Sequence, residues 1–98
     1  ESACINTGGE KVFAEEVESV LRARDDVYDV LVVGAPDERW GERVSAIVQA
    51  APGTEPTADE LIAHCRAHLA RYKCPQKVNF VEELPQNLAG KVIRRALR

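Results

Sequence analysis

The sequence has no methionine and few aromatic residues, and both shortages restrict the classes of protein to which the chain can belong. Because the chain opens at Glu1 without an initiator methionine, we expect a fragment of a longer protein. Aromatic residues make up 5% of the 98 residues, too few for the stacking surface on which single-stranded nucleic acids bind. The net charge of −3 is also acidic, so we expect no nucleic-acid partner.

Long apolar runs and paired cysteines are lacking too. No run approaches the roughly 20 apolar residues of a transmembrane helix, and no signal or transit peptide is visible. The three cysteines, Cys4, Cys65 and Cys74, are odd in number and form no CxxC motif. Their pattern argues against a disulfide framework or a four-thiolate zinc site. We therefore expect a cytoplasmic protein, with peripheral contact to a membrane as the alternative.

What is present fits one soluble domain with a modest core, since 45% of residues are hydrophobic and 30% are charged. The charge is unevenly placed. Residues 1–60 contain 5 Lys/Arg and 14 Asp/Glu, whereas residues 61–98 contain 8 and 2. The basic second part offers a surface for an anion, and a solvated face without function is the competing interpretation.

The residue pattern predicts an α+β domain, a small sheet with helices packed on it. Gly8 and Gly9 between two short runs predict an N-terminal β-hairpin. Thr57 followed by Glu60 has the form of a helix capping box. The expected elements are strands over 4–7, 10–13, 27–35, 43–51 and 77–81, and helices over 14–24, 57–70 and 91–98.

The two longer helices show apolar periodicity. In the first, Val17, Val20 and Leu21 share one face, and we place Glu18 and Arg22 off that face. In the second, the predicted buried stripe is Leu61, Ile62, Cys65 and Leu69. His64 and His68 stand at i and i+4, a spacing that zinc sites use. Because Cys65 belongs to the apolar stripe and no acidic residue completes the set, we expect no metal site.

Lys91 is the strongest candidate for a catalytic residue. It follows Gly90 at the end of a predicted loop, where glycine lets a phosphate approach closely. A flexible ammonium there suits a phosphoryl or acyl-phosphate transition state, in which negative charge grows on oxygens. The alternative is a helix-start lysine without function. The chain shows no Ser/His/Asp set, Walker loop or GxGxxG motif, so the rest of an active site would lie on another domain.

Three other features suit a ligand, and each has a plain structural alternative. The Gly8–Gly9 pair is either a hairpin turn alone or, in addition, one side of a channel in which the lack of Cβ atoms leaves room for a narrow ligand. Trp40, in a polar loop, is either an exposed contact residue or packed in part on the core. Arg71, Lys73 and Lys77 form a basic turn that suits phosphate or is merely solvated.

Four ordered stretches resemble motifs of the C-terminal domain of the adenylate-forming (AMP-binding) superfamily. That superfamily contains acyl-CoA synthetases, nonribosomal-peptide adenylation domains and beetle luciferases, and the likeness is strongest to acyl-CoA synthetases and fatty-acid–CoA ligases. The stretches span essentially the whole chain, so their order and spacing are specific. They are Ile5–Glu18, Val33–Glu42, Tyr72–Pro75 and Leu84–Lys91.

The resemblance implies that residues 1–98 are the C-terminal lid of a two-step ligase. A large N-terminal domain, absent here, would hold ATP, Mg²⁺ and the acyl group. The lid would present Lys91 for acyl-adenylate formation, then rotate to present the hairpin at Gly8 and Gly9, beside which the pantetheine of CoA enters.

The expected partners are the missing domain, CoA and the acyl-adenylate. Trp40 and the turn Tyr72, Lys73 and Cys74 would line the nucleotide end of CoA. Related CoA ligases often carry basic residues where Cys74 and Gln76 stand, so we expect phosphate contact from Lys73 or Lys77.

Two alternatives remain at this point, a lid that loads a carrier protein and a non-catalytic binding module. The fragment alone is expected to be inactive and to bind no cofactor tightly. Its acyl substrate is expected to be a fatty or aromatic acid.

Overall fold

The fold was determined as a computed structural model, in which residues 4–84 are described. The predicted α+β class is confirmed, as is the N-terminal hairpin. The elements are β1 (Cys4–Thr7), β2 (Glu10–Phe13), α1 (Ala14–Arg22), β3 (Val27–Asp37), β4 (Gly41–Ala50), α2 (Ala58–His68), the 3₁₀ turn η1 (Arg71–Lys73) and β5 (Lys77–Val81). The predicted helix over 91–98, and with it Lys91, lies outside the described residues. No helix within residues 4–84 is long and apolar enough to cross a membrane.

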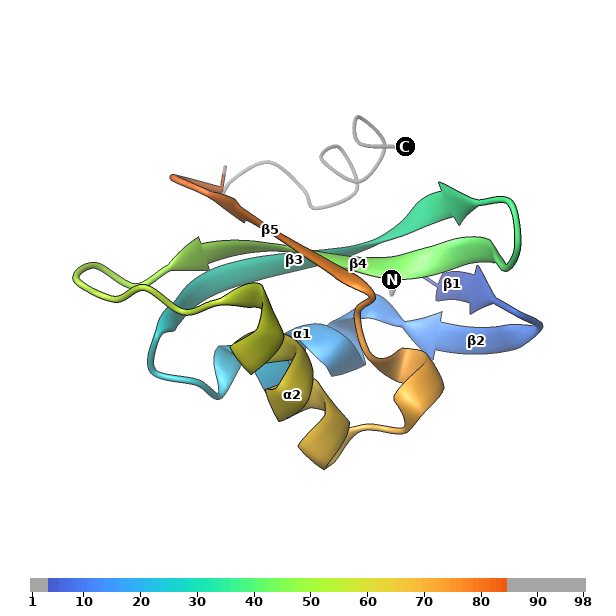
Figure 1. The fold of residues 1–98 in the computed structure, drawn as a ribbon, viewed down its shortest axis with the longest axis horizontal. Helices are drawn as coiled ribbons and strands as arrows, with labels where there is room; N and C mark the ends of the chain where they lie inside the picture. The colour runs from blue at the N-terminus through green and yellow to red at the C-terminus, as the bar shows by residue number, and fades with distance from the viewer. Residues whose placement is uncertain (1–3, 85–98) are drawn as a thin grey trace.

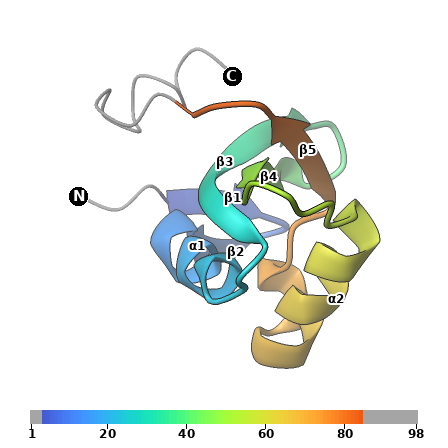
Figure 2. The ribbon, with the colours of Figure 1, turned by 90° about the vertical axis from the view of Figure 1, so that its left-hand side faces the viewer.

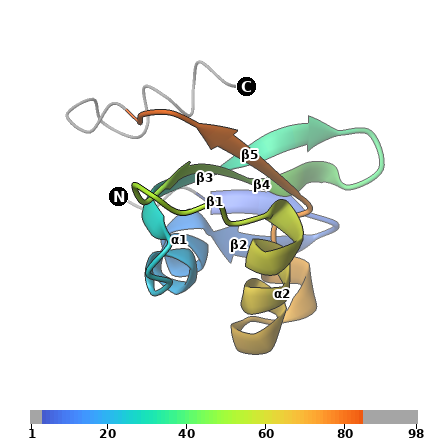
Figure 3. The same ribbon diagram turned by 60° about the vertical axis from the view of Figure 1, so that its left-hand side comes forward.

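The five strands form one sheet in the order β2-β1-β4-β3, and β5 adds to β4 in parallel. β3 and β4 form a long antiparallel hairpin that is the body of the sheet. The short β1–β2 hairpin turns through Gly8 and Gly9 at φ 59° and 86°, the left-handed values that its two-residue turn requires. Figure 3 shows this turn and the β3–β4 turn at the same end of the domain.

Both helices cover the same face of the sheet (Figure 1, Figure 2). Because side chains alternate along a strand, every second residue of β3 and β4 faces the helices. The main core lies between these layers and includes Val17, Leu21, Val30, Val32, Val44, Val48, Leu61 and Cys65. A second cluster, on the opposite face of β3 and β4, consists of Leu31, Val33, Ile47 and Leu84.

The helix α2 follows its sequence pattern closely. Thr57 Oγ1 accepts from the Glu60 N–H at 3.1 Å, and Glu60 Oε1 accepts from the Thr57 N–H at 3.0 Å, so the predicted capping box is confirmed. Leu61 and Cys65 are fully buried in the core, with Ile62 and Leu69 packed in part against it. The predicted buried stripe is therefore confirmed for Leu61 and Cys65, whereas Ile62 and Leu69 are only partly buried.

Several element boundaries were predicted wrongly. β3 continues through Pro36 and Asp37, which we expected to end it, because β3 is an edge strand and an edge position does not require the proline to donate. β4 accordingly begins at Gly41 rather than at 43. The helix α1 ends at Arg22 and α2 at His68, each two residues earlier than predicted.

The placement of Glu18 was wrong as well. We put it off the apolar face of α1, yet it is 5% exposed. Its Oε2 accepts from the Val32 N–H at 2.8 Å, and Arg22 Nη2 donates to the Val30 carbonyl at 3.2 Å. α1 thus supplies hydrogen-bond partners to the outer edge of β3, where no other strand of residues 4–84 pairs.

Candidate functional site

A groove of about 530 Å³ lies between the β1–β2 hairpin, the β3–β4 turn, α2 and η1. Four of the predicted site residues line it, and they come from distant parts of the sequence. They are Gly8, Trp40, Tyr72 and Cys74. Tertiary structure therefore gathers most of the predicted CoA-binding residues around one hollow.

Trp40 is held at the rim of this groove by its own turn. Asp37 Oδ1 accepts from the backbone N–H groups of Arg39 and Trp40 at 2.8 and 2.9 Å. These hydrogen bonds, that from Trp40 foremost, lower the pKa of the Asp37 carboxyl. The indole remains 42% exposed, and the Arg39 guanidinium lies 5.2 Å from its ring centre. Trp40 thus offers an aromatic face beside a cation.

Gly8 lies against the Trp40 indole. The backbone N–H of Gly8 donates to the Trp40 carbonyl at 2.9 Å. A Cβ added at Gly8 would lie 2.8 Å from Trp40 Cε3, closer than carbon atoms can pack. The absence of a side chain at Gly8 is therefore required by Trp40, in addition to the positive φ of the turn.

Gly9 has different surroundings. Within residues 4–84, no heavy atom apart from those of Gly9 and its two chain neighbours lies within 4 Å of a Cβ built there, so this part of the structure leaves the space beside Gly9 open. Its φ of 86° still favours glycine. Of the two hairpin glycines, Gly8 is covered by protein and Gly9 faces space that a ligand can use.

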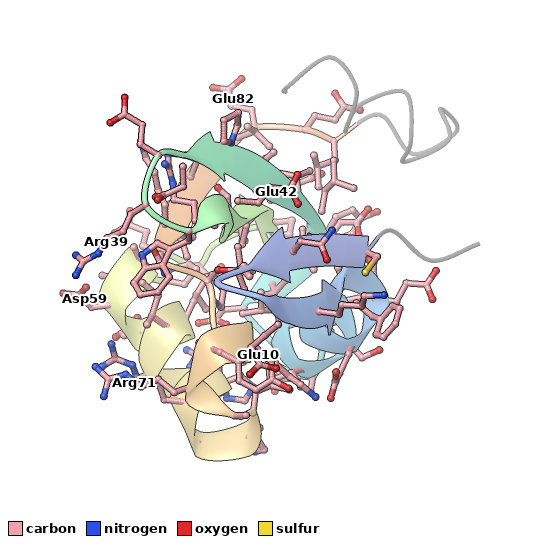
Figure 4. The ribbon with its side chains drawn as sticks, turned by 90° about the vertical axis from the view of Figure 1, so that its right-hand side faces the viewer. Glu10, Arg39, Glu42, Asp59, Arg71 and Glu82 are labelled. Atoms are coloured by element: carbon pink, nitrogen blue, oxygen red, sulfur yellow. The ribbon has the colours of Figure 1, made fainter. Side chains whose placement is uncertain are left out.

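Two arginines, Arg66 on α2 and Arg71 in η1, line the groove. Within residues 4–84 neither forms an ion pair, so both guanidiniums are available for an anion. Burial raises the pKa of the Cys74 thiol, and the positive charges of Arg66 and Arg71 oppose that rise, which places both cations near Cys74. Figure 4 shows Arg71 and Arg39 projecting toward the same side of the molecule.

Lys73 does not line the groove. Its Nζ lies 3.0 and 3.1 Å from the two carboxylate oxygens of Glu16 on α1, and this contact raises the pKa of Lys73. The same ammonium lies 5.9 Å from the Tyr72 ring centre. Lys77, at the start of β5, is exposed and also outside the groove lining. Of the residues that the structure describes, the cations that line the groove are therefore Arg66 and Arg71.

Sequence reasoning named Arg71 but missed Arg66. The missed signal was helical spacing, because Arg66 follows Ile62 by four residues and so lies on the same face of α2. Ile62 lines the groove together with Arg66. Glu10 of β2 also lines it and brings a negative charge to the hairpin side.

The histidines of α2 are used in packing. His64 Nε2 lies 2.9 Å from the Val20 carbonyl of α1, and His68 Nδ1 lies 2.9 Å from the His64 carbonyl. Burial raises the pKa of the Cys65 thiol to about 11, so that sulfur stays protonated at neutral pH. Within residues 4–84 no group of three or more His, Cys, Asp or Glu could hold a metal ion.

Comparison with known proteins gives the class to which this fold and groove belong. Residues 16–91 match the family described as AMP-binding enzyme C-terminal domain. Because the match covers most of the chain, this protein belongs to that family.

Particular relatives are similar over nearly the whole chain. A 3-oxocholest-4-en-26-oate–CoA ligase of Rhodococcus rhodochrous is 52% identical over 90 residues, which cover 92% of this chain and 16% of the ligase. A fatty acid–[acyl-carrier-protein] ligase of Streptomyces coeruleorubidus is 45% identical over 94 residues, 96% of this chain and 18% of that protein.

Among solved structures, a fatty acyl CoA synthetase of Mycobacterium tuberculosis superposes with a TM-score of 0.85 at 40% identity. The superposition covers 95% of this chain and 19% of that one. The chain thus spans less than a fifth of the relatives and of the structure named here.

Proposed function

We propose that this domain is the C-terminal lid of an ATP-dependent acyl-CoA ligase. In the first half-reaction a carboxylate oxygen attacks the α-phosphorus of ATP, and pyrophosphate leaves with the electron pair of the broken P–O bond. In the second, the thiol of CoA attacks the acyl carbon, loses its proton and displaces AMP. The large domain would bind ATP, Mg²⁺ and the acyl group, and the lid would complete the site for each step.

The observation that carries the proposal is the groove beside Trp40. Exposed Trp40 and Tyr72 offer ring faces on which an adenine can stack, with the cations of Arg66 and Arg71 on the same groove. A guanidinium binds phosphate oxygens with two parallel hydrogen bonds. Adenine next to several phosphates is the chemistry of the nucleotide end of CoA.

The open space at Gly9 suits the other end of CoA. We assign the passage of pantetheine to this glycine, where no described residue other than its chain neighbours would meet a Cβ within 4 Å. A pantetheine arm is narrow and uncharged, so it needs space more than it needs charged partners. The groove and Gly9 lie on the same hairpin, which lets one ligand use both.

We assign the first half-reaction to Lys91. The attacking carboxylate and the α-phosphate are both anions, so their approach is unfavourable until a cation lies between them. A lysine on a flexible stem can contact both, and rotation of the lid would then remove it before the thiol arrives. Removal of a preorganised charge partner of this kind costs about 10²–10³ in rate.

A carrier protein is the second candidate acceptor, because one relative is a fatty acid–[acyl-carrier-protein] ligase. A carrier presents its pantetheine through a single phosphodiester and has no adenine nucleotide. Trp40, Tyr72, Arg66 and Arg71 would then have no ligand in the groove, so we favour free CoA. The relatives also suggest the acyl class, and we propose a fatty acid or a steroid carboxylate.

The test separates the two half-reactions in the longer enzyme. Lys91→Ala should lower pyrophosphate release by about 10²–10³ and leave conversion of supplied acyl-adenylate to thioester nearly unchanged. Gly9→Leu should do the reverse, because it fills the space beside the turn. CoA and a pantetheine-bearing carrier are compared as acceptors. Equal loss of both steps in either variant, or transfer to the carrier alone, contradicts the proposal.

A further inference from the structure

The β1–β2 hairpin is joined to the body of the sheet by a short contact. In register, β1 pairs with β4 at Thr7 and Gly41, and the Gly8 N–H donates to the Trp40 carbonyl at 2.9 Å, whereas β3 and β4 pair along their lengths. A two-stranded hairpin is marginally stable by itself. Additional contacts must therefore fix the position of the Gly8–Gly9 turn.

Glu42 supplies such a contact with its side chain. One residue beyond the Thr7–Gly41 pair, Glu42 Oε1 accepts from the Asn6 N–H at 3.0 Å. A carboxylate thus takes the place of the backbone carbonyl that a continued ladder would offer. Hydrogen bonds to an ionised acceptor are roughly twice as strong as neutral ones.

Gly34 of β3 makes room for that carboxylate. Gly34 pairs with Val44, so the side chain of Glu42, two residues along β4, lies on the face where a side chain of Gly34 would lie. A Cβ built on Gly34 would be 3.0 Å from Cδ and from both carboxylate oxygens of Glu42. Gly34 has no positive φ, so the backbone does not demand glycine there. Space for Glu42 is the reason that the structure offers.

We propose that Glu42, seated on Gly34, is a positioning residue that holds the Gly8–Gly9 turn in place for the thiol-transfer step. This inference rests on the proposed function, because the step that it serves is thioester formation. None of these hydrogen bonds joins Glu42 to Gly9. It acts through Asn6, two residues before the turn, and so sets where the turn lies relative to the groove.

Amide hydrogen exchange of Asn6 in this chain tests the contact itself. Glu42→Ala should speed exchange at Asn6 about tenfold, and Glu42→Gln, which keeps an oxygen acceptor, should recover part of the protection. Gly34→Ala should act like Glu42→Ala by displacing the carboxylate. The matched control is Glu38→Ala, an exposed glutamate in the turn that precedes β4. Unchanged Asn6 exchange in both Glu42→Ala and Gly34→Ala overturns the inference.

The half-reactions of the longer enzyme test the role. Glu42→Ala should slow thioester formation from supplied acyl-adenylate about tenfold, leave pyrophosphate release unchanged, and be rescued in part by Glu42→Gln. Equal losses in both half-reactions would mean that Glu42 is only structural. If the unmodified enzyme forms no thioester with CoA, the proposed function fails, whereas normal thioester formation by Glu42→Ala defeats this inference alone.

Discussion

The outer edge of β3 and the groove beside Trp40 both carry charged side chains, but their surroundings differ. At the edge, Glu18 accepts from the Val32 N–H, and Arg22 Nη2 lies 3.2 Å from Asp29 Oδ1 and 3.2 Å from the Val30 carbonyl. Every one of these groups has a partner within the domain. Their charges complete a sheet edge that would otherwise expose its backbone.

In the groove the pattern is reversed. Arg66 and Arg71 form no ion pair within residues 4–84, and Trp40 and Tyr72 remain 42% and 43% exposed. The difference indicates that charge at the β3 edge stabilises the fold, whereas charge in the groove is available for a ligand.

The largest expected effect is on stability at the β3 edge. Glu18→Ala removes a buried acceptor from the Val32 N–H and should lower the free energy of unfolding by about 1–3 kcal/mol. Denaturant unfolding of this chain measures it. The exposed Glu38, changed to alanine, is the control and should alter stability by less than about 0.5 kcal/mol. Equal effects of the two substitutions would mean that Glu18 does not stabilise the β3 edge more than an exposed glutamate does.

The second prediction concerns the stability of the core at alkaline pH. Burial raises the pKa of Cys65 from 9.0 to about 11. Below pH 9 both folded and unfolded states keep the proton, so stability is unaffected. Between the two values only the unfolded state ionises, and stability falls by about 2 kcal/mol as pH rises. Cys65→Ala should remove most of this loss and leave the smaller part that comes from the raised pKa of Cys74, and Cys4→Ala, at an exposed thiol, should leave the loss unchanged.

The groove should respond in binding and not in stability. Arg66→Gln and Arg71→Gln should each raise KM for CoA in the longer enzyme about tenfold, since each removes a charged hydrogen-bond donor to phosphate. Arg22→Gln, at the β3 edge, should leave that KM unchanged. Lys73→Gln should also leave it unchanged, because Lys73 contacts Glu16. If Lys73→Gln raises KM as much as the two arginine substitutions do, the phosphate contact would have to be assigned to Lys73 as well.

The smallest effect compares the two hairpin glycines. Both Gly8→Ala and Gly9→Ala force alanine into a positive φ, but only the first brings a Cβ against Trp40. Gly8→Ala should therefore cost about 1 kcal/mol more than Gly9→Ala in denaturant unfolding. It should also shift the emission of Trp40, the one tryptophan of the chain, toward longer wavelength. Identical spectra would show that the indole does not rest on Gly8.

Several residues that line the candidate groove could be named from the sequence, because the naming depended on local signals and on resemblance. Gly8, Trp40, Tyr72 and Cys74 were selected from their own motifs and now line one groove. Lys73 was selected in the same way and lies outside it. The sequence offered no means of separating the two cases, since Lys73 stands between Tyr72 and Cys74.

By itself, the sequence determined the features that depend on neighbouring residues. The glycine turn follows from the φ values that two adjacent glycines allow, and the capping box follows from the reach of Glu60 to Thr57. Only tertiary structure decided which partner each long charged side chain reaches. Lys73 meets Glu16 across 57 positions, and Asn6 meets Glu42 across 36. The physical reason is that a side chain binds the nearest complementary group in space, and packing of distant elements sets which group is nearest.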